Sequence, residues 1–435
     1  MQRHISTQLS AWKNKKNRKP LIIRGARQVG KTWAMKQFGQ TDFRQTAYIN
    51  FDNNERMKRL FEGDYDINRL INGLKIESGV DIQPENTLLI FDEIQEVPRA
   101  LSALKYFYEQ RPEFHIVAAG SLLGVALHNG TSFPVGKVDF LNLYPMDFCE
   151  FLLAMKQQPL LDLLIMQDWQ LISDFKSKYI GLLRQYYFIG GMPEVVQEFV
   201  DTQNMWNVRQ IQKNLLLAYE QDFSKYAESR IVPRIRLLWN EIPTQLAKEN
   251  KKFVFSEVQQ GTRARDFEIA LRWLKDCGLV YSIYRVKQPK LPLTAYQDNA
   301  FKLFSLDVGL LAAQCQLDET VLLEGNRLFT EFKGALTKQY VLQQLLVAQQ
   351  YVPFYWSAER GMAEVDFVLQ HKQNVIPIEV KAEENLKAKS LKSYCEKYQP
   401  HFAVRSSMSN FRKEEWLINL PLYAISQLEN LSNSE

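Results

Sequence analysis

The stretch from Leu21 to Thr32, Leu-Ile-Ile-Arg-Gly-Ala-Arg-Gln-Val-Gly-Lys-Thr, constrains the fold of this chain more than any other. A short apolar run followed by G-x-x-x-x-G-K-T is typical of the loop that joins a buried strand to a helix and wraps the phosphates of a nucleotide. Gly25 and Gly30 let the backbone turn tightly and bring its N–H groups close to phosphate oxygens. Lys31 supplies a positive charge to the outer phosphates, and Thr32 offers a hydroxyl to Mg²⁺.

The predicted nucleotide-binding residues are Gly25, Ala26, Arg27, Gln28, Val29, Gly30, Lys31 and Thr32. The alternative is a glycine-containing strand-to-helix turn that binds nothing. A full match to the motif after an apolar run is uncommon by chance, which favours the nucleotide site.

Two further segments continue a strand–helix–strand pattern. Residues 46–51 are rich in β-prone types, and residues 87–93, Thr-Leu-Leu-Ile-Phe-Asp-Glu, form an apolar run that ends in two acids. Such a run is typical of a central parallel strand buried on both faces. Because carboxylates at the end of that strand lie beside the phosphate loop, we expect Asp92 to hold Mg²⁺ through its water shell and Glu93 to orient and deprotonate the attacking water. An acid pair can also simply cap a helix.

The segment 114–120 predicts the next strand, and Ser121 follows its end. A small polar side chain there can sense the γ-phosphate or orient the water, and it can equally be an N-cap or turn residue. Arg27, Arg99 and Arg111 are the nearest candidates for an arginine that stabilises the transition state. A neighbouring subunit often delivers such an arginine, so the sequence does not choose among them.

Length and composition bound the class of protein. At about 150 residues per domain, 435 residues predict about three domains, and 46% hydrophobic with 24% charged residues indicates a globular chain. No apolar run approaches the ~20 residues that cross a bilayer, and the first residues lack the apolar centre of a signal peptide, so we expect no membrane partner and a cytoplasmic location. Cys149, Cys277, Cys315 and Cys395 lack C-x-x-C spacing, which predicts free thiols. A net charge of +5 permits nucleic-acid binding without arguing for it.

Four segments carry a resemblance to a known family. They are 25–32 (Gly-Ala-Arg-Gln-Val-Gly-Lys-Thr), 91–95 (Phe-Asp-Glu-Ile-Gln), 119–124 (Ala-Gly-Ser-Leu-Leu-Gly) and 144–151 (Tyr-Pro-Met-Asp-Phe-Cys-Glu-Phe). These segments are similar to the AAA-type prokaryotic P-loop ATPases, a family of largely unknown role. Those proteins pair an N-terminal ATPase core with a helical and winged-helix middle and a C-terminal domain like restriction endonucleases. The resemblance implies that organisation over nearly the whole of this chain.

The middle of the chain has a pattern that fits a helical and winged-helix region. Residues 151–235 carry apolar residues at three- and four-residue spacing, as packed amphipathic helices do, with a glycine- and proline-containing turn at 190–194. Residues 236–300 predict a short helix, then a longer amphipathic helix and then a hairpin. This order of elements is typical of a winged helix. The longer helix of this segment has four positive residues on it or near it: Arg263, Arg265, Arg272 and Lys275. A helix that binds in a DNA groove needs such positive charge. A winged helix can equally be a packing or protein-docking module.

A second chemical signal lies within residues 363–381, where two β-rich runs flank four polar residues. They predict a hairpin in which Glu379 and Lys381 emerge on one face and Asp366 meets them from the paired strand. Two carboxylates at one point bind a divalent cation, and a neighbouring lysine positions or deprotonates water at a phosphodiester. This D…E-x-K arrangement resembles PD-(D/E)xK nucleases. Pro377 is awkward in a strand predicted to be central, because it cannot donate a ladder hydrogen bond.

One position argues against an active nuclease. The resemblance implies a glutamate on the helix before this hairpin, and the matching residue here is Lys338. A lysine there removes one metal ligand and adds a competing positive charge. Glu331 lies about two helical turns earlier on the same face, and Glu364 shares a strand face with Asp366, so either acid is a candidate to compensate.

The expected fold class is a multidomain α/β chain. It comprises an AAA-type P-loop ATPase domain with a parallel sheet at 1–150, a helical lid region at 151–235, a winged-helix-like domain at 236–322 and a PD-(D/E)xK nuclease-like domain at 323–435. Our first hypothesis is a Mg-dependent ATPase that binds ATP and uses hydrolysis to reposition the later segments, with DNA or RNA as a candidate target and a homo-oligomer left open. The alternatives are an ATP-gated, metal-dependent nuclease and a nucleotide-dependent interaction switch whose nuclease domain is degenerate.

Overall fold

The computed structural model describes residues 3–120, 133–248, 252–259, 261, 263–321, 330–348, 351–359, 363–384 and 388–433. The chain forms two compact units. Unit 1 comprises residues 1–144 and 276–278, and unit 2 comprises residues 145–275 and 279–435. Ser121 lies outside the described residues, so its predicted role as a sensor stays a prediction.

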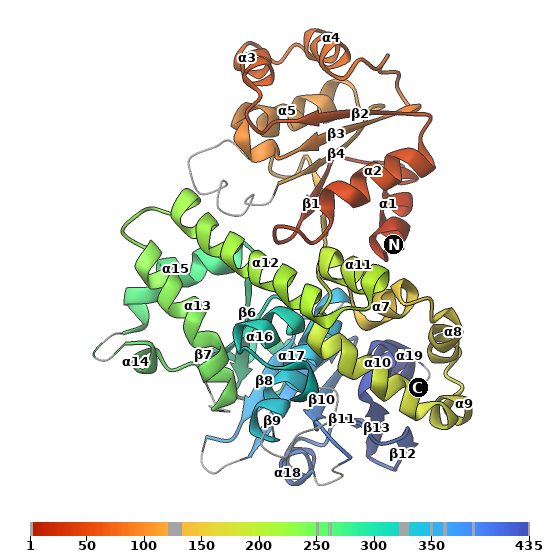
Figure 1. The fold of residues 1–435 in the computed structure, drawn as a ribbon, viewed down its shortest axis with the longest axis vertical. Coiled ribbons are helices and arrows are strands. Elements are labelled where there is room, and N and C mark those ends of the chain that lie inside the picture. The colour runs from red at the N-terminus through yellow and green to blue at the C-terminus, as the bar shows by residue number, and fades with distance from the viewer. Residues whose placement is uncertain are drawn as a thin grey trace. The chain divides into compact units, whose positions relative to one another are not determined.

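Unit 1 contains a five-stranded parallel sheet in the order β2-β3-β4-β1-β5 (Figure 1). Its strands are β1 (Leu21–Arg24), β2 (Gln45–Asn50), β3 (Thr87–Asp92), β4 (His115–Ala119) and β5 (Asp139–Asn142). The bounds of β1 to β4 match the four strands predicted from the sequence, whereas β5 lies in a segment for which the sequence predicts no strand. All residues of β3 and β4 are buried, as the apolar runs predict for inner parallel strands. Because all strands run the same way, the phosphate loop after β1 and the acids after β3 emerge at one edge of the sheet.

Helices cover both faces of this sheet. They are α1 (Ile5–Lys13), α2 (Lys31–Asp42), α3 (Glu55–Glu62), α4 (Ile67–Ser78) and α5 (Pro98–Gln110), and the short helix η1 (Ile94–Glu96) follows β3. Alternate strand residues such as Ile49 and Leu89 share a buried core with Leu70 of α4 and Leu104 of α5. Phe38 of α2 is buried outside that core, and α2 contacts β2, β3 and β4. The unit is therefore a mixed α/β layer structure with the architecture of a P-loop NTPase core.

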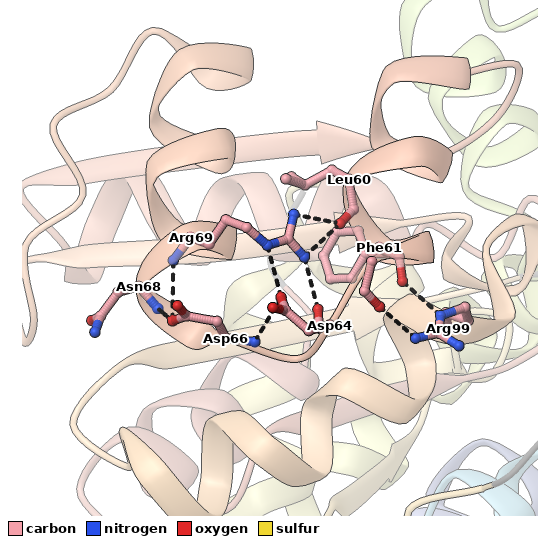
Figure 2. A network of polar contacts seen from close by, with 8 residues as sticks. Leu60, Phe61, Asp64, Asp66, Asn68, Arg69 and Arg99 are labelled. Carbon is pink, nitrogen blue, oxygen red and sulfur yellow. Dashed lines mark hydrogen bonds and ion pairs between the residues drawn. The ribbon is translucent and has the colours of Figure 1, made fainter.

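Two arginines brace the connection between α3 and α4 (Figure 2). Arg99, near the start of α5, donates from Nε to the carbonyl oxygen of Phe61 at 2.7 Å and from Nη2 to that of Gly63 at 2.6 Å. Arg69 donates from Nη1 and Nη2 to the carbonyl oxygen of Leu60, both at 3.1 Å. The last carbonyls of a helix lack helical partners and form the negative end of its dipole, so both cations stabilise the end of α3.

Unit 2 begins with a series of helices, as predicted for residues 151–235. They are α7 (Phe148–Ala154), α8 (Gln158–Met166), α9 (Trp169–Asp174), α10 (Lys176–Ile189), α11 (Pro193–Thr202), α12 (Met205–Tyr226) and α13 (Val232–Ala247). Two more helices, α14 (Phe255–Val258) and α15 (Ala264–Asp276), precede the first strand of the unit. The order of helix, helix and hairpin that the sequence predicts after residue 236 is therefore present.

An eight-stranded sheet runs through the rest of unit 2, in the order β12-β13-β11-β10-β9-β8-β6-β7 (Figure 1). Its strands are β6 (Val280–Val286), β7 (Gln297–Ser305), β8 (Phe354–Ser357), β9 (Glu364–His371), β10 (Asn374–Val380), β11 (Ala403–Ser407), β12 (Arg412–Lys413) and β13 (Leu417–Pro421). The intervening helices are η2 (Leu293–Tyr296), α16 (Val308–Gln314), α17 (Thr330–Val347) and α18 (Lys389–Tyr398), and the chain closes with η5 (Leu422–Gln427) and α19 (Leu428–Asn433).

This sheet joins two segments that the sequence places in separate domains. The hairpin β6–β7 comes from residues 236–322, and β6 also pairs in parallel with β8, where Tyr284 lies opposite Phe354. Val286 of β6 shares a buried cluster with Val365 of β9 and Leu391 of α18. The winged-helix and nuclease-like assignments and the four domain ranges stay predictions, but strands from both segments share one core.

The hairpin predicted within 363–381 is formed by β9 and β10, with His371 opposite Asn374. Pro377 lies opposite Val368 of β9, whereas pairing with β11 begins one residue later, at Ile378. The missing N–H of Pro377 therefore falls before the ladder on the β11 side begins, which explains why an inner strand tolerates it.

A buried polar network ties α16 and α17 to the turn at 190–194. The carboxylate of Asp307, which has no exposed surface, accepts hydrogen bonds from the backbone N–H of Gly191 at 2.6 Å and from Nε2 of Gln343 at 3.0 Å. The same Nε2 donates to the hydroxyl of Tyr186 at 2.8 Å. Burial raises the pKa of Asp307, and these hydrogen bonds offset part of the cost of burying its charge.

Among the described residues, no helix combines the length and the apolar character needed to cross a membrane. Cys149, Cys277, Cys315 and Cys395 are free thiols, as predicted. Burial raises the pKa of the Cys395 thiol to about 11, so this thiol stays protonated near neutral pH.

Candidate functional site

In unit 1, β1 leads directly into the loop predicted to bind phosphates. Gly25 and Gly30 adopt φ angles of 154° and 95°, in the region that favours glycine. A Cβ added at position 25 would lie 2.2 Å from the carbonyl oxygen of Leu143, so the loop closes only around a glycine there. Helix α2 starts at Lys31, which places the positive end of its dipole at the end of the loop.

Lys31 folds back over this loop. Its side chain is buried, and Nζ donates to the carbonyl oxygens of Gly25 at 2.9 Å and Ala26 at 2.7 Å. Burial lowers the pKa of Lys31 to about 8, although the carboxylates of Glu93 and Asp92 act in the opposite direction. Burying a charged ammonium costs free energy because it loses its hydration. An anion bound beside the ammonium offsets part of that cost, so this site favours an anion. The loop therefore fits a phosphate group.

Asp92 ends β3 beside the loop, although sixty residues separate it from Thr32. Its Oδ2 accepts hydrogen bonds from Oγ1 of Thr32 at 2.7 Å and from the hydroxyl of Tyr48 at 2.9 Å, and its Oδ1 accepts from the backbone N–H of Glu93 at 3.1 Å. Hydroxyl and carboxylate oxygens are the hard ligands that Mg²⁺ takes. The two residues predicted to hold the ion are in direct contact and fit it.

Glu93 follows in a left-handed backbone conformation, with φ 51°. Residues other than glycine in this region cost of order 1 kcal/mol and concentrate at functional sites. The side chain is half-buried, and its Oε2 accepts a hydrogen bond from Nε2 of Gln95 at 2.6 Å. Asp92 and Glu93 are therefore adjacent in sequence but differ in environment: one carboxylate is buried against Thr32, and the other is partly accessible and oriented by an amide.

Sequence reasoning missed Tyr48 and Gln95. Tyr48 lies in β2, two residues before Asn50, and Asn50 is the register partner of Asp92 in β3. Because side chains alternate along a strand, Tyr48 lies on the same face of the sheet as Asn50 and Asp92. Burial and the Asp92 carboxylate raise the pKa of Tyr48 far above its ordinary value. The ammonium of Lys36 lies 3.9 Å from the centre of the Tyr48 ring, which holds the ring in place.

The three candidate arginines have different surroundings. Arg99 holds the end of α3 (Figure 2), and Arg111 binds Glu113 through Nε at 2.5 Å and Asn68 through Nη1 at 2.8 Å. Arg27 is exposed within the phosphate loop, where its charge lowers the pKa of Lys31. Arg99 and Arg111 therefore serve local structure in unit 1.

The second predicted site lies in unit 2, where each acid has a lysine partner. We call this group the acid–lysine cluster, and its residues are Glu364, Asp366, Glu379, Lys302, Lys338 and Lys381. Lys338 Nζ lies 3.0 Å from Asp366 Oδ1, and Lys381 Nζ lies 2.6 Å from Glu379 Oε1. Lys302 forms an ion pair with Glu364. The structure therefore places the predicted acids on neighbouring strands, each in an ion pair.

Asp366 and Glu379 each use their second carboxylate oxygen to accept a hydrogen bond from the backbone. Asp366 Oδ2 accepts from the N–H of Val380 at 2.8 Å, and Glu379 Oε2 accepts from the N–H of Leu391 at 3.2 Å. Burial acts to raise the pKa of Asp366, but Lys338 and the backbone hydrogen bond outweigh it, and the pKa lies below its ordinary value. For Glu379 burial prevails, and its pKa is raised.

The described residues contain no group of three or more His, Cys, Asp or Glu side chains placed to hold a metal ion. Of the two acids expected to compensate for Lys338, Glu364 is paired with Lys302, and the side chain of Glu331 lies outside the described residues. The residues present in this cluster therefore do not fit a divalent cation.

Comparison with known proteins bears on both units. Residues 17–152 match the family model described as an AAA domain. Residues 180–321 and 333–424 match two domains of unknown function, DUF8612 and DUF4143. The AAA part of the predicted resemblance is confirmed, whereas the winged-helix and nuclease-like parts stay predictions. No curated protein matches the chain.

Solved structures show a distant likeness. The Walker-type ATPase of Pyrococcus abyssi aligns with a TM-score of 0.45 and 14% identity, covering 71% of this chain and 94% of that chain. The Aeropyrum pernix ORC2 protein in its ADP form aligns with a TM-score of 0.30 and 14% identity, covering 77% of this chain and 93% of that chain. Both TM-scores lie below 0.5, so this likeness carries no argument about function.

Proposed function

We propose, from the premise that residues 17–152 are an AAA-type P-loop ATPase domain, that the chain binds ATP with Mg²⁺ and hydrolyses it. The observation that carries this proposal is the 2.7 Å hydrogen bond between Thr32 and Asp92, which brings the end of the phosphate loop and the end of β3 together. Either motif alone is compatible with a turn or a helix cap. Their contact supports a single Mg-nucleotide site.

The residues of unit 1 have distinct roles in this proposal. The backbone N–H groups of residues 25–32 and the Lys31 ammonium bind the phosphates, and the dipole of α2 adds to their attraction. Thr32 and Asp92 would hold Mg²⁺, which neutralises negative charge on the outer phosphates. Glu93, oriented by Gln95 at 2.6 Å, is the general base that orients and deprotonates the attacking water.

The decisive experiment is Mg-dependent phosphate release by the full chain, compared between wild type and Glu93→Gln. Loss of a general base costs about 10²- to 10⁴-fold in rate, so we expect the variant to lose at least 10²-fold while it still binds ATP. Glu96→Gln is the matched control, because Glu96 is an exposed carboxylate three residues further along. An unchanged rate of phosphate release in folded Glu93→Gln protein would contradict the proposal.

DNA or RNA remains open as the target of the ATPase. Arg265 and Arg272 of α15 have exposed side chains, but their carboxylate partners Asp266 and Glu268 lie on the same helix and offset their charge. The phosphate-release assay with added single-stranded DNA, duplex DNA or RNA tests this partner, because a nucleic-acid target should stimulate turnover.

A further inference from the structure

We propose that the acid–lysine cluster of unit 2 is closed to divalent cations because the Lys338 ammonium stands where a metal ion would bind, and that reversing this one charge would open the cluster to Mg²⁺ or Mn²⁺. This inference goes beyond ATP hydrolysis, since it concerns residues of the other unit.

Both carboxylate oxygens of Asp366 already have a positively polarised partner. The Lys338 ammonium is 3.0 Å from Oδ1, and the backbone N–H of Val380 is 2.8 Å from Oδ2. A hard cation binds carboxylate oxygens at about 2.0–2.6 Å. An ion at that distance from Oδ1 would be in contact with a like-charged ammonium, so it would have to displace Lys338 from its own ion pair.

The contacts of Glu379 repeat this arrangement. Lys381 lies 2.6 Å from Oε1, and the N–H of Leu391 lies 3.2 Å from Oε2. With Lys302 bound to Glu364, the cluster has three carboxylates and three ammonium groups and is neutral as a whole. A divalent cation needs an excess of negative charge, and this cluster has none.

The space beside the cluster is also unsuited to a cation. A cavity of about 30 Å³ lies there, large enough for a water molecule or two. Its lining includes Lys252, Lys302 and Lys338, together with the apolar Phe253 and Phe304. Positive side chains in a small, partly apolar cavity raise the free energy of a cation that enters it.

Lys338→Glu reverses the charge at the central position. The six groups then comprise four carboxylates and two ammonium groups, a net charge of −2. The new carboxylate is shorter than lysine and starts from the same backbone position on α17, so a cation between it and Asp366 fills the gap. We expect this variant to gain a site with oxygen ligands from residue 338, Asp366 and Glu379.

The test is Mn²⁺ binding to the full chain without nucleotide, measured by calorimetry and by the electron paramagnetic resonance signal of free Mn²⁺. Wild type and Asp366→Asn should behave alike at millimolar Mn²⁺. Lys338→Glu should bind one additional equivalent at least tenfold more tightly than wild type, and the double variant Lys338→Glu/Asp366→Asn should lose it. Lys333→Glu is the matched control, because Lys333 is on the same helix but pairs with Glu383, and it should resemble wild type.

Two outcomes would overturn the proposal. In the first, wild type binds Mn²⁺ at a site that Asp366→Asn abolishes, which would mean that the metal displaces Lys338 readily. In the second, folded Lys338→Glu, with a normal thermal unfolding transition, gains no equivalent. If Lys338→Glu fails to fold, Lys338→Met removes the ammonium and keeps an unbranched side chain. That variant should bind Mn²⁺ more tightly than wild type and less tightly than a four-carboxylate site, and no gain would count against the proposal.

Discussion

The buried ammonium of Lys31 predicts how nucleotide affinity depends on pH. Its pKa is lowered to about 8, because burial disfavours the charged form, whereas nucleotide binding needs that charge. About a tenth of the free protein has lost this proton at pH 7 and about nine tenths at pH 9, so Mg-nucleotide affinity should fall roughly tenfold over that range. Above pH 8, binding should take up about one proton.

The same shift has the opposite sign for stability. The unfolded chain keeps the Lys31 proton up to its ordinary pKa, so between pH 8 and pH 10.5 the unfolded state holds more protons than the folded state. The nucleotide-free protein should therefore gain stability as pH rises through this window, while nucleotide affinity falls. A general loss of structure at high pH would lower both quantities, so the opposite trends separate Lys31 from that explanation.

The assay is calorimetric binding of Mg-ADP at constant free Mg²⁺, from pH 7 to pH 9 and in buffers of different ionisation enthalpy. Lys31→Arg is the control, because a guanidinium keeps its charge throughout and should give a flat profile at whatever affinity it retains. Tyr48 does not titrate in this window, since its pKa is raised. Equal affinity at pH 7 and pH 9 in wild type, or the same decline in Lys31→Arg, would refute the assignment.

Three substitutions test packing and hydrogen bonding in the two units. A Cβ at Gly191 would lie 2.0 Å from the carbonyl oxygen of Met146, so Gly191→Ala should lower the free energy of unfolding by about 1–3 kcal/mol in a denaturant titration. Gly181→Ala, in α10 with nothing within 4 Å of the added Cβ, should instead stabilise by about 0.5–1 kcal/mol, and similar effects of both would contradict the reasoning. Tyr48→Phe removes the 2.9 Å hydrogen bond to Asp92 and should cost about 1 kcal/mol by the same measurement, while an unchanged midpoint would mean that water replaces the hydroxyl.

The site in unit 1 was largely predictable because its determinants are local. The spacing of Gly25, Gly30 and Lys31 fixes a loop geometry, and a buried parallel strand must end at the edge of the sheet where that loop lies. These rules place Asp92 beside Thr32 across sixty residues without any knowledge of the intervening helices. They do not place Tyr48, because a tyrosine in a strand carries no motif and its partner depends on the register between β2 and β3.

The organisation of unit 2 was less predictable because it depends on pairing between distant segments. The hairpins β6–β7 and β9–β10 follow from local patterns, but the contact of Tyr284 with Phe354, which merges them into one sheet, has no local signature. Lys338 shows an intermediate case. From the sequence, a lysine at position 338 argues against a metal site, because it replaces an expected acidic ligand. The structure adds the contact itself, an ion pair between Lys338 and Asp366.

The shared core of unit 2 changes what ATP hydrolysis can be expected to move. The first hypothesis had ATP hydrolysis reposition the helical, winged-helix and C-terminal segments, and it did not say whether they move together. Asp307 accepts hydrogen bonds from Gly191 of the first segment and Gln343 of the last, and all three residues are buried. Moving either segment away would leave a buried carboxylate without its donors, which costs more than breaking an exposed ion pair. We therefore expect any rearrangement driven by unit 1 to act on unit 2 as one body.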